Sequence, residues 1–140
     1  MNIYFSCSIT GGRQDQHAYR EIVDYLISRG YKVLTAQLAD PDIIRTEGSL
    51  AADLVYQRDV NWIHQCDVMV AEVSTPSHGV GYEIALALQL GKHVCCCYQS
   101  GRKVSKMILG NPDKNLWIFS YQSLEKALED MRGFLNSFII

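Results

Sequence analysis

The stretch "DVMVAEVSTPSHGVGYEIALALQLGKHVCCCY", residues 67–98, decides the fold of this protein. It opens and closes with short, almost continuously apolar runs, at 67–73 and 93–98, and the apolar pattern at 80–90 is typical of a helix. Strands that are apolar on both faces are typical of a parallel sheet, and parallel neighbours need a crossover to connect them. The stretch therefore predicts two parallel strands joined by a helix.

The same alternation continues in both directions along the chain. It predicts further strands at 2–6, 32–35 and 115–119, and further helices at 15–29, 50–65, 103–109 and 122–136. We expect residues 1–140 to form a single α/β domain, a doubly wound parallel sheet of about five strands, flavodoxin-like or Rossmann-like, with helices on both faces. In a 2-1-3-4-5 strand order, the ligand cleft lies between the carboxyl ends of the first and third strands.

Composition limits what this domain can do. A chain of 140 residues, of which 48% are hydrophobic and 20% charged, is expected to fold around one core. The net charge of −2 argues against a protein that coats nucleic acid, and no apolar run approaches the ~20 residues that span a bilayer. We expect a cytoplasmic protein, or a nuclear one in a eukaryote, with no nucleic-acid or membrane partner.

The cysteines and histidines predict neither disulfides nor a metal site. Five cysteines is an odd number, and Cys95, Cys96 and Cys97 are consecutive in an apolar run, which favours buried reduced thiols. The four histidines show no metal-ligand spacing with the cysteines. We therefore expect no metal and no cofactor.

The loop after the first strand, "CSITGGR" at residues 7–13, has the features of an anion-binding turn. A loop that ends a strand and opens a helix can bind phosphate through its backbone amides and the helix dipole. It also contains two glycines for close backbone approach, two hydroxyls and a guanidinium that can donate two hydrogen bonds: Gly11, Gly12, Ser8, Thr10 and Arg13. A glycine turn without a ligand is the alternative.

The same loop has the spacing of a cysteine-phosphatase loop. Five residues separate Cys7 from Arg13, and helix-terminal amides would lower the pKa of the thiol. Gln14 stands where those enzymes usually place a Ser or Thr that assists the thiolate, although Asp40 is available as an acid. The residues alone leave open whether Cys7 is a nucleophile.

The loop after the third strand leads into an apolar helix through Glu83. We expect this carboxylate in the first turn of the helix, where the positive end of the dipole favours the ionised form that a nucleophile or base requires. The alternative is an acid that only complements the dipole. No Ser or Thr stands three residues earlier to complete a capping box, and the following residues are apolar, so this helix is expected to be buried.

Two further polar residues fall on surfaces expected to be apolar. Helical spacing places Asp59 on the same inward face as Ile63, where a carboxylate needs a partner or a function. We do not expect an ion pair with Arg58, because adjacent helical positions do not face each other, and a distant partner is the alternative. Tyr4 lies in the first strand, from which its hydroxyl could reach a carboxylate in the cleft, a plain core tyrosine being the alternative.

A basic cluster near the end of the chain is interpreted as a solvated helix start. It consists of Arg102, Lys103 and Lys106, and Ser105 beside it could also contact an anion.

Three blocks of the sequence together resemble one enzyme family. They are "IYFSCSITGGRQD" at 3–15, "RDVNWIHQCDVMVAEVSTPSHGVGYEIALAL" at 58–88 and "SGRKVSKMI" at 100–108. In order and over nearly the full length, they are similar to the 2′-deoxynucleoside 5′-phosphate N-hydrolases of the nucleoside 2-deoxyribosyltransferase superfamily. The block at 71–83 is the most specific, because few other sheets would join a strand to a glutamate through such a loop.

The resemblance implies a chemistry and its residues. Glu83 matches the nucleophile that attacks C1′ of the deoxyribose and forms a glycosyl-enzyme intermediate, which water then hydrolyses. Asp59 matches a second catalytic carboxylate, and Tyr4 a tyrosine that orients the nucleophile. The implied substrate is a deoxynucleoside 5′-monophosphate, which is cleaved to free base and 2-deoxyribose 5-phosphate.

The resemblance also implies a phosphate site and a homodimer. The residues that match the phosphate site are Cys7, Ser8, Ile9, Thr10, Gly11, Gly12 and Arg13 of the first loop, with Ser77 and Gly79 of the second. Ser105 matches a serine that reaches the phosphate site of the neighbouring subunit, so two copies of the chain are expected to assemble.

The sequence departs from the mammalian members of this family at three positions. Cys7 replaces a glycine and Thr10 an arginine, so those members bind phosphate without this cysteine. Gln37 replaces a histidine of the sugar and base region, which leaves base preference and selectivity for 2′-deoxyribose open. The alternatives are a CMP-type ribonucleotide N-glycosidase, a nucleoside deoxyribosyltransferase, a cysteine phosphatase and a non-catalytic nucleotide-binding module.

Overall fold

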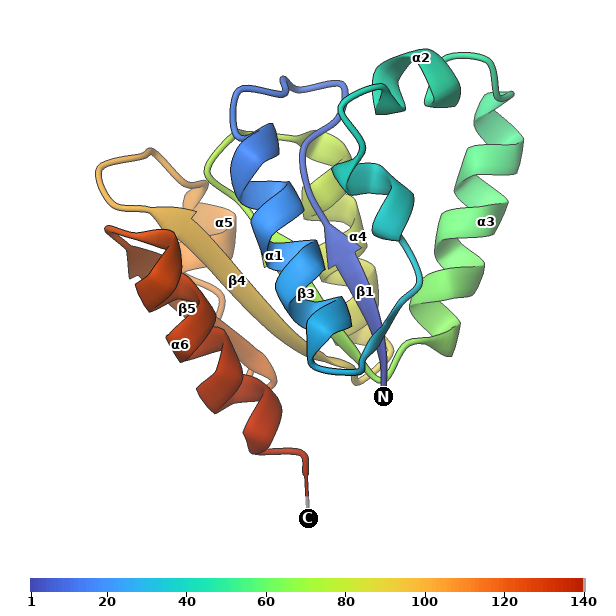
Figure 1. Ribbon diagram of the computed structural model, residues 1–140. Coiled ribbons are helices and arrows are strands. Elements are labelled where there is room, and N and C mark those ends of the chain that lie inside the picture. The colour runs from blue at the N-terminus through green and yellow to red at the C-terminus, as the bar shows by residue number, and fades with distance from the viewer. Residues whose placement is uncertain (140) are drawn as a thin grey trace.

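The computed structural model describes residues 1–139 and contains one five-stranded parallel sheet (Figure 1). The strands are β1 (Asn2–Ser6), β2 (Lys32–Val33), β3 (Val68–Glu72), β4 (His93–Gln99) and β5 (Leu116–Tyr121). The helices are α1 (Gln16–Ser28), the 3₁₀-helix η1 (Ala36–Ala39), α2 (Ile43–Glu47), α3 (Ala52–Gln65), α4 (His78–Gln89), α5 (Lys106–Leu109) and α6 (Leu124–Asn136). The strand order is β2-β1-β3-β4-β5, which confirms the predicted α/β fold and is the flavodoxin-like one of the two orders considered.

Helices cover both faces of the sheet, as the apolar strands require. Successive residues of a strand point to opposite faces, so Phe5 and Val70 pack toward α1 and α6, and Tyr4 and Met69 toward α3 and α4. Figure 1 shows α1 and α6 on one side of the sheet and α4 and α5 on the other. The sheet thus separates two apolar cores, and the residues of β1 divide between them.

The structure differs from the sequence prediction mainly between residues 33 and 52. The segment that follows the short strand β2 forms η1 and α2, neither of which was predicted. A helix of one or two turns is too short to display an apolar period, and tertiary contacts decide whether it forms.

Helix α4 begins at His78, two residues earlier than expected. The Ser77 hydroxyl accepts a hydrogen bond from the Val80 amide (3.3 Å) and caps the helix. The apolar period starts only after this cap, which is why the sequence pattern placed the start too late. Because the helix starts earlier, every residue of α4 lies two positions further from its N-terminus than expected.

The loops after β1 and β3 lie against each other at the carboxyl edge of the sheet. A β-carbon on Gly11 would overlap the Pro76 carbonyl oxygen, so only glycine allows this approach. Gly12 has φ +132°, a backbone conformation that also favours glycine. The glycines of the first loop therefore fix its contact with the second.

Within residues 1–139 we find no helix with both the length and the apolar character required to cross a membrane.

Candidate active site

Glu83 projects from α4 toward the end of β1 and is held there by a serine. The Ser6 hydroxyl donates a hydrogen bond to Glu83 Oε2 (2.7 Å). Because α4 begins at His78, Glu83 occupies the second turn of the helix, and the prediction of a first-turn residue was wrong. The helix dipole acts mainly within the first turn, so it gives this carboxylate little stabilisation.

The electrostatic surroundings of Glu83 also differ from the expected ones. Burial raises the pKa of Glu83 to about 7, and the negative charge of Asp59 acts in the same direction. The hydrogen bond from Ser6 and the positive charge of Arg58 oppose this rise. Glu83 therefore exchanges a proton near neutral pH, where both the ionised nucleophile and its acid form are accessible.

Asp59, a residue of α3, lies near Glu83 and forms an ion pair with the preceding residue, Arg58. Arg58 Nε lies 2.9 Å from Asp59 Oδ1, and Arg58 Nη1 lies 2.8 Å from Glu47 Oε1 at the end of α2. The expectation that Arg58 would not pair with Asp59 was wrong, because the long arginine side chain folds over the Trp62 ring, 4.9 Å from its centroid, and turns back to the carboxylate. Burial raises the pKa of Asp59, and Arg58 opposes that rise.

Tyr4 lies in β1 beneath these two carboxylates and is fully buried. Among residues 1–139 its hydroxyl has no partner that satisfies hydrogen-bond geometry. Burial, followed by the charges of Glu83 and Asp59, raises the pKa of Tyr4 well above its usual range. The hydroxyl therefore keeps its proton and can donate a hydrogen bond to an ionised carboxylate.

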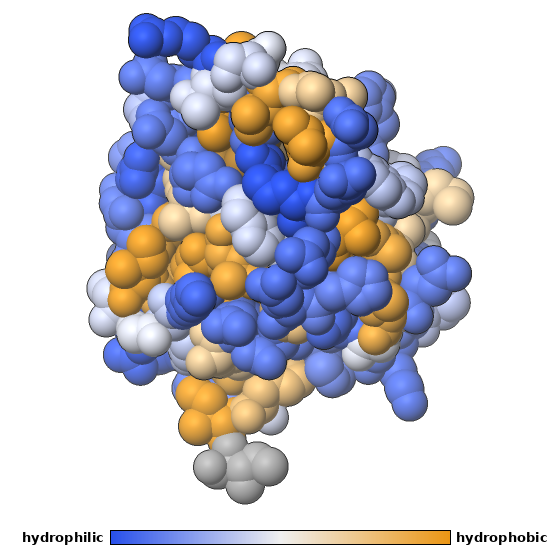
Figure 2. Space-filling view, turned by 90° about the vertical axis from the view of Figure 1, so that its right-hand side faces the viewer, coloured by the Kyte–Doolittle hydropathy of each residue, from blue (hydrophilic) through white to orange (hydrophobic). Residues whose placement is uncertain are grey.

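A cavity of about 700 Å³ joins the carboxylates to the first loop. One end is lined by Cys7, Ile9, Thr10, Gly12, Ser77, Gly79 and Val80, the other by Ile44, Glu47, Gly48, Leu50, Ala52 and Val55, with Asp59 and Glu83 also in its wall. Figure 2 views the side of the molecule that bears α2 and α3, where apolar and polar side chains surround a hollow. The cavity thus joins residues of the two loops to a set of mostly apolar residues from α2, α3 and the segment between them.

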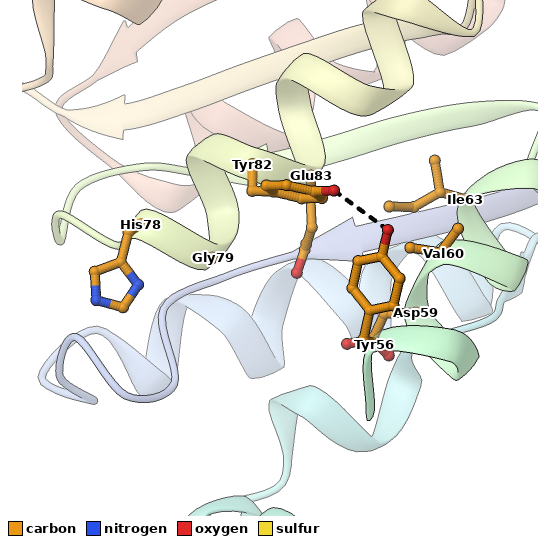
Figure 3. Close-up of a pocket in the computed structure, with 8 residues that line it drawn as sticks. All are labelled: Tyr56, Asp59, Val60, Ile63, His78, Gly79, Tyr82 and Glu83. Carbon is orange, nitrogen blue, oxygen red and sulfur yellow. Dashed lines mark hydrogen bonds between the residues drawn. The ribbon is translucent and has the colours of Figure 1, made fainter. Parts of the chain in front are cut away.

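A second hollow of about 410 Å³ opens between α3 and α4 and shares the two carboxylates (Figure 3). Asp59 and Glu83 extend into it from the two helices. Two exposed tyrosines stand at its mouth, and the hydroxyls of Tyr56 and Tyr82 lie 3.3 Å apart. The carboxylates are thus reached from two sides.

The polar side chains of the first loop differ in their hydrogen-bond partners. Ser8 is fully buried, and its hydroxyl has no partner among the described residues. Arg13 donates to the backbone carbonyls of Ser8 (3.2 Å) and Asp40 (2.9 Å) and lies over the Tyr19 ring. Arg13 is not among the residues that line the large cavity, whereas four other residues of the loop, Cys7, Ile9, Thr10 and Gly12, are.

The thiol of Cys7 does not have the properties of a phosphatase nucleophile. Cys7 is 4% exposed, and burial raises its pKa to about 12 even though the nearby Arg13 opposes the rise. A nucleophilic cysteine requires the thiolate, which a buried thiol with this pKa does not form near neutral pH. The structure therefore argues against the cysteine-phosphatase alternative.

Two residues of the basic cluster have different surroundings. Arg102 pairs with the buried Asp15 through Nη2 and Oδ1 (2.8 Å), so the interpretation of this arginine as part of a solvated helix start was wrong. Ser105 caps α5 by accepting from the Met107 amide (3.2 Å) and lines a separate hollow beside Ser77, away from Glu83 of its own chain.

Two residues of the site, Ser6 and Glu47, were not predicted from the sequence. Ser6 could have been found, because strand periodicity puts it on the same face as Tyr4 and directs both toward α4. Glu47 has no such signal, since it lies in a short helix that the pattern did not reveal. Gln37 is exposed and lines none of the cavities described above.

In the part of the chain that the structure describes, no three His, Cys, Asp or Glu side chains gather in a way that could hold a metal ion. The chemistry available at this site is that of two carboxylates, a serine, a tyrosine and an arginine.

Comparisons with known proteins give consistent results. The family profile described as nucleoside 2-deoxyribosyltransferase matches residues 3–134. The 5-hydroxymethyl-dUMP N-hydrolase of Rattus norvegicus is 41% identical over 135 residues, which cover 91% of this chain and 82% of the rat protein. A Methanosarcina mazei protein, provisionally named a 2′-deoxynucleoside 5′-phosphate N-hydrolase, is 39% identical over 136 residues, with 97% of this chain and 84% of that protein covered.

A solved structure shares the fold. The Clostridium botulinum CMP N-glycosidase superposes with a TM-score of 0.72 at 18% sequence identity, covering 96% of this chain and 99% of that one. At this identity the similarity shows a common fold only.

Proposed function

Because the chain belongs to the nucleoside 2-deoxyribosyltransferase family, we propose that it is a nucleotide N-hydrolase that cleaves the N-glycosidic bond of 2′-deoxynucleoside 5′-monophosphates. The products are the free base and 2-deoxyribose 5-phosphate. The observation that carries this proposal is the large cavity, which is lined both by the partly buried Glu83 and by residues of the first loop. A phosphate at the loop would place the sugar over Glu83 and the base toward the apolar end.

The proposed first step is attack of the Glu83 carboxylate on C1′ of the sugar. A bond forms between Glu83 and C1′ while the C1′–N bond breaks, and the departing base takes a proton from Asp59. Ser6 holds the attacking carboxylate by its 2.7 Å hydrogen bond, and the protonated Tyr4 hydroxyl beneath it directs the same group. Burial raises the pKa of Asp59 above its usual range, which favours the protonated form that a general acid requires.

The proposed second step returns the enzyme to its starting state. Water attacks C1′, Asp59 accepts a proton from it, and the ester between C1′ and Glu83 breaks. If a second base took the place of water, the protein would be a deoxyribosyltransferase, which differs only in the acceptor. The phosphate-binding features of the first loop favour a nucleotide over a nucleoside as the substrate.

One assay tests this proposal directly. The protein is incubated with each common deoxyribonucleoside and ribonucleoside monophosphate, and the products are identified as free base or inorganic phosphate. We expect base release from deoxynucleotides, loss of at least about 10³-fold in Glu83→Gln, and near-full activity in Cys7→Ser. Release of phosphate that depends on Cys7, or full activity in Glu83→Gln, would contradict the proposal.

We also propose that two copies of the chain assemble, with Ser105 of each completing the phosphate site of the other. The support is the exposed position of Ser105 at the start of α5, in a hollow of about 470 Å³ that also contains Ser77 of the second loop. Met107 beside it is 84% exposed, which is unusual for a large apolar side chain.

A further inference from the structure

Asp15 is a buried carboxylate that the proposed chemistry does not use. It directly precedes α1, where an aspartate commonly caps the helix, yet its side chain makes no capping hydrogen bond. The residue is 4% exposed. Its hydrogen bonds are made instead with loops far away in the sequence, which indicates a function other than starting the helix.

The Asp15 carboxylate accepts four hydrogen bonds from two other loops. Oδ2 accepts from Thr75 Oγ1 (2.7 Å) in the loop after β3, and Oδ1 accepts from Gln99 Nε2 (3.2 Å) at the end of β4. Arg102, in the loop after β4, donates to both oxygens (2.8 and 3.3 Å). Asp15 itself ends the loop after β1, so one carboxylate joins the three loops at the carboxyl edge of the sheet.

These are the loops that carry the proposed phosphate site. Asp15 follows Arg13 by two positions, Thr75 precedes Ser77 by two, and Arg102 precedes Ser105 by three. A second contact supports the same arrangement, because the Ser74 hydroxyl accepts from the amide of Gln99 (2.8 Å). A shift of any one loop would break bonds to a charged, buried acceptor, which is costly.

We propose that Asp15 is a positioning residue for the 5′-phosphate, acting through Thr75 and Arg102. It does not touch the substrate; it fixes the separation between the loops whose amides and hydroxyls would hold the phosphate. This inference rests on the phosphate site of the proposed function, but it can be tested without base cleavage. It predicts that the Asp15 network sets affinity for phosphate and leaves the chemistry at Glu83 intact.

The first test uses inorganic phosphate as the probe. Asp15→Asn keeps the shape of the side chain but removes the charge that pairs with Arg102. Asp24→Asn is the matched control, because Asp24 lies in α1, the helix that Asp15 precedes, and makes an exposed ion pair with Arg20 (3.8 Å). We expect phosphate to raise the melting temperature of the wild type and of Asp24→Asn, and the rise to disappear in Asp15→Asn.

The second test separates positioning from general damage. In Asp15→Asn the KM for a deoxynucleoside 5′-monophosphate should rise at least about 10-fold, with kcat within about 3-fold of wild type. Turnover of the corresponding unphosphorylated deoxynucleoside should change less than about 3-fold, because that substrate does not use the phosphate site. A merely structural role would lower both activities together.

The outcomes decide between the inference and the proposed function. If phosphate stabilises Asp15→Asn as strongly as wild type, or does not stabilise wild type, the inference is wrong whatever the enzyme does to nucleotides. If wild type binds phosphate but releases no base, the proposed function fails and the inference stands. Should Asp15→Asn not fold, Thr75→Val removes one hydrogen bond to Oδ2 at nearly constant shape, and the same two measurements on that variant decide.

Discussion

At the scale of single residues, the central feature of the site is Glu83, whose burial disfavours the ionised form of its carboxyl group. Glu83 and Glu72 lie on opposite faces of the sheet, and burial raises the pKa of each to about 7. Glu72 is fully buried and accepts one hydrogen bond, from the amide of Ser74 (2.7 Å). Both carboxyls therefore hold a proton more tightly in the folded protein than in the unfolded chain.

This predicts that stability falls as the pH rises from acid to neutral, and that a single substitution reduces the fall. A raised folded-state pKa contributes stability that is fully present below the unfolded pKa, 4.5 for glutamate, and is lost as the pH rises through about 7. The free energy of unfolding should therefore fall between pH 5 and pH 8 in wild type, and Glu83→Gln should remove part of that fall, on the order of 2 kcal/mol.

Urea unfolding at the two pH values measures this difference. Glu129→Gln, an exposed residue of α6, is the matched control and should behave as wild type. The remaining fall in Glu83→Gln is expected from Glu72. Equal pH dependence in wild type and Glu83→Gln would contradict the assignment.

At the scale of elements, the short helix α2 is attached to α3 by an ion pair. Arg58 bridges Glu47 of α2 and Asp59 of α3, so the element that lines the apolar end of the cavity and the second carboxylate share one arginine. An isolated helix of five residues is unstable in water. Its position over the cavity therefore depends on this contact and on the burial of Ile43.

Two variants separate the functions of this arginine. Glu47→Gln removes the bond to α2 but keeps the pair with Asp59, and we expect KM to rise about 3- to 10-fold with the pH–rate profile little changed. Arg58→Gln also removes the charge that opposes the rise of the Asp59 pKa. The limb of the profile governed by Asp59 should then move to higher pH.

The measurement is kcat/KM against pH for both variants beside wild type. An unshifted profile in Arg58→Gln would show that Asp59 does not titrate in the reaction. A shift in Glu47→Gln as large as that in Arg58→Gln would assign the effect to α2 and not to the ion pair with Asp59.

At the scale of the whole molecule, the proposed assembly can be tested by mixing two defective variants. Glu83→Gln lacks the nucleophile and Ser105→Ala lacks the residue proposed to act in the neighbouring subunit. If the two are unfolded and refolded together in equal amounts, half of the dimers contain one of each, and one site in each such dimer is complete. We expect recovery of about a quarter of wild-type activity in the mixture.

Size-exclusion chromatography with light scattering checks the oligomeric state of each preparation. If Ser105 acts only within its own chain, the mixture will show no more than half the activity of Ser105→Ala alone. That result, or a monomeric wild type, would contradict the proposed assembly.

The sequence by itself determined the parallel α/β class of the sheet, its two-sided helical cover, and the elements that carry Glu83 and the first loop. Those features follow from local periodicity, which reports whether a side chain faces inward and where the chain turns. Periodicity does not identify the distant residues that an inward-facing side chain will contact. Only the tertiary structure decided that Ser6 holds Glu83, that Arg58 turns back to Asp59, and that Asp15 joins three loops.

The limits of local sequence patterns also explain why the charge state predicted for Glu83 differs from the one that the structure indicates. The sequence favoured an ionised Glu83 at a helix start, whereas the folded chain places it one turn later and removes water from it. A pKa depends on desolvation and on charges from several elements at once, and packing alone sets both.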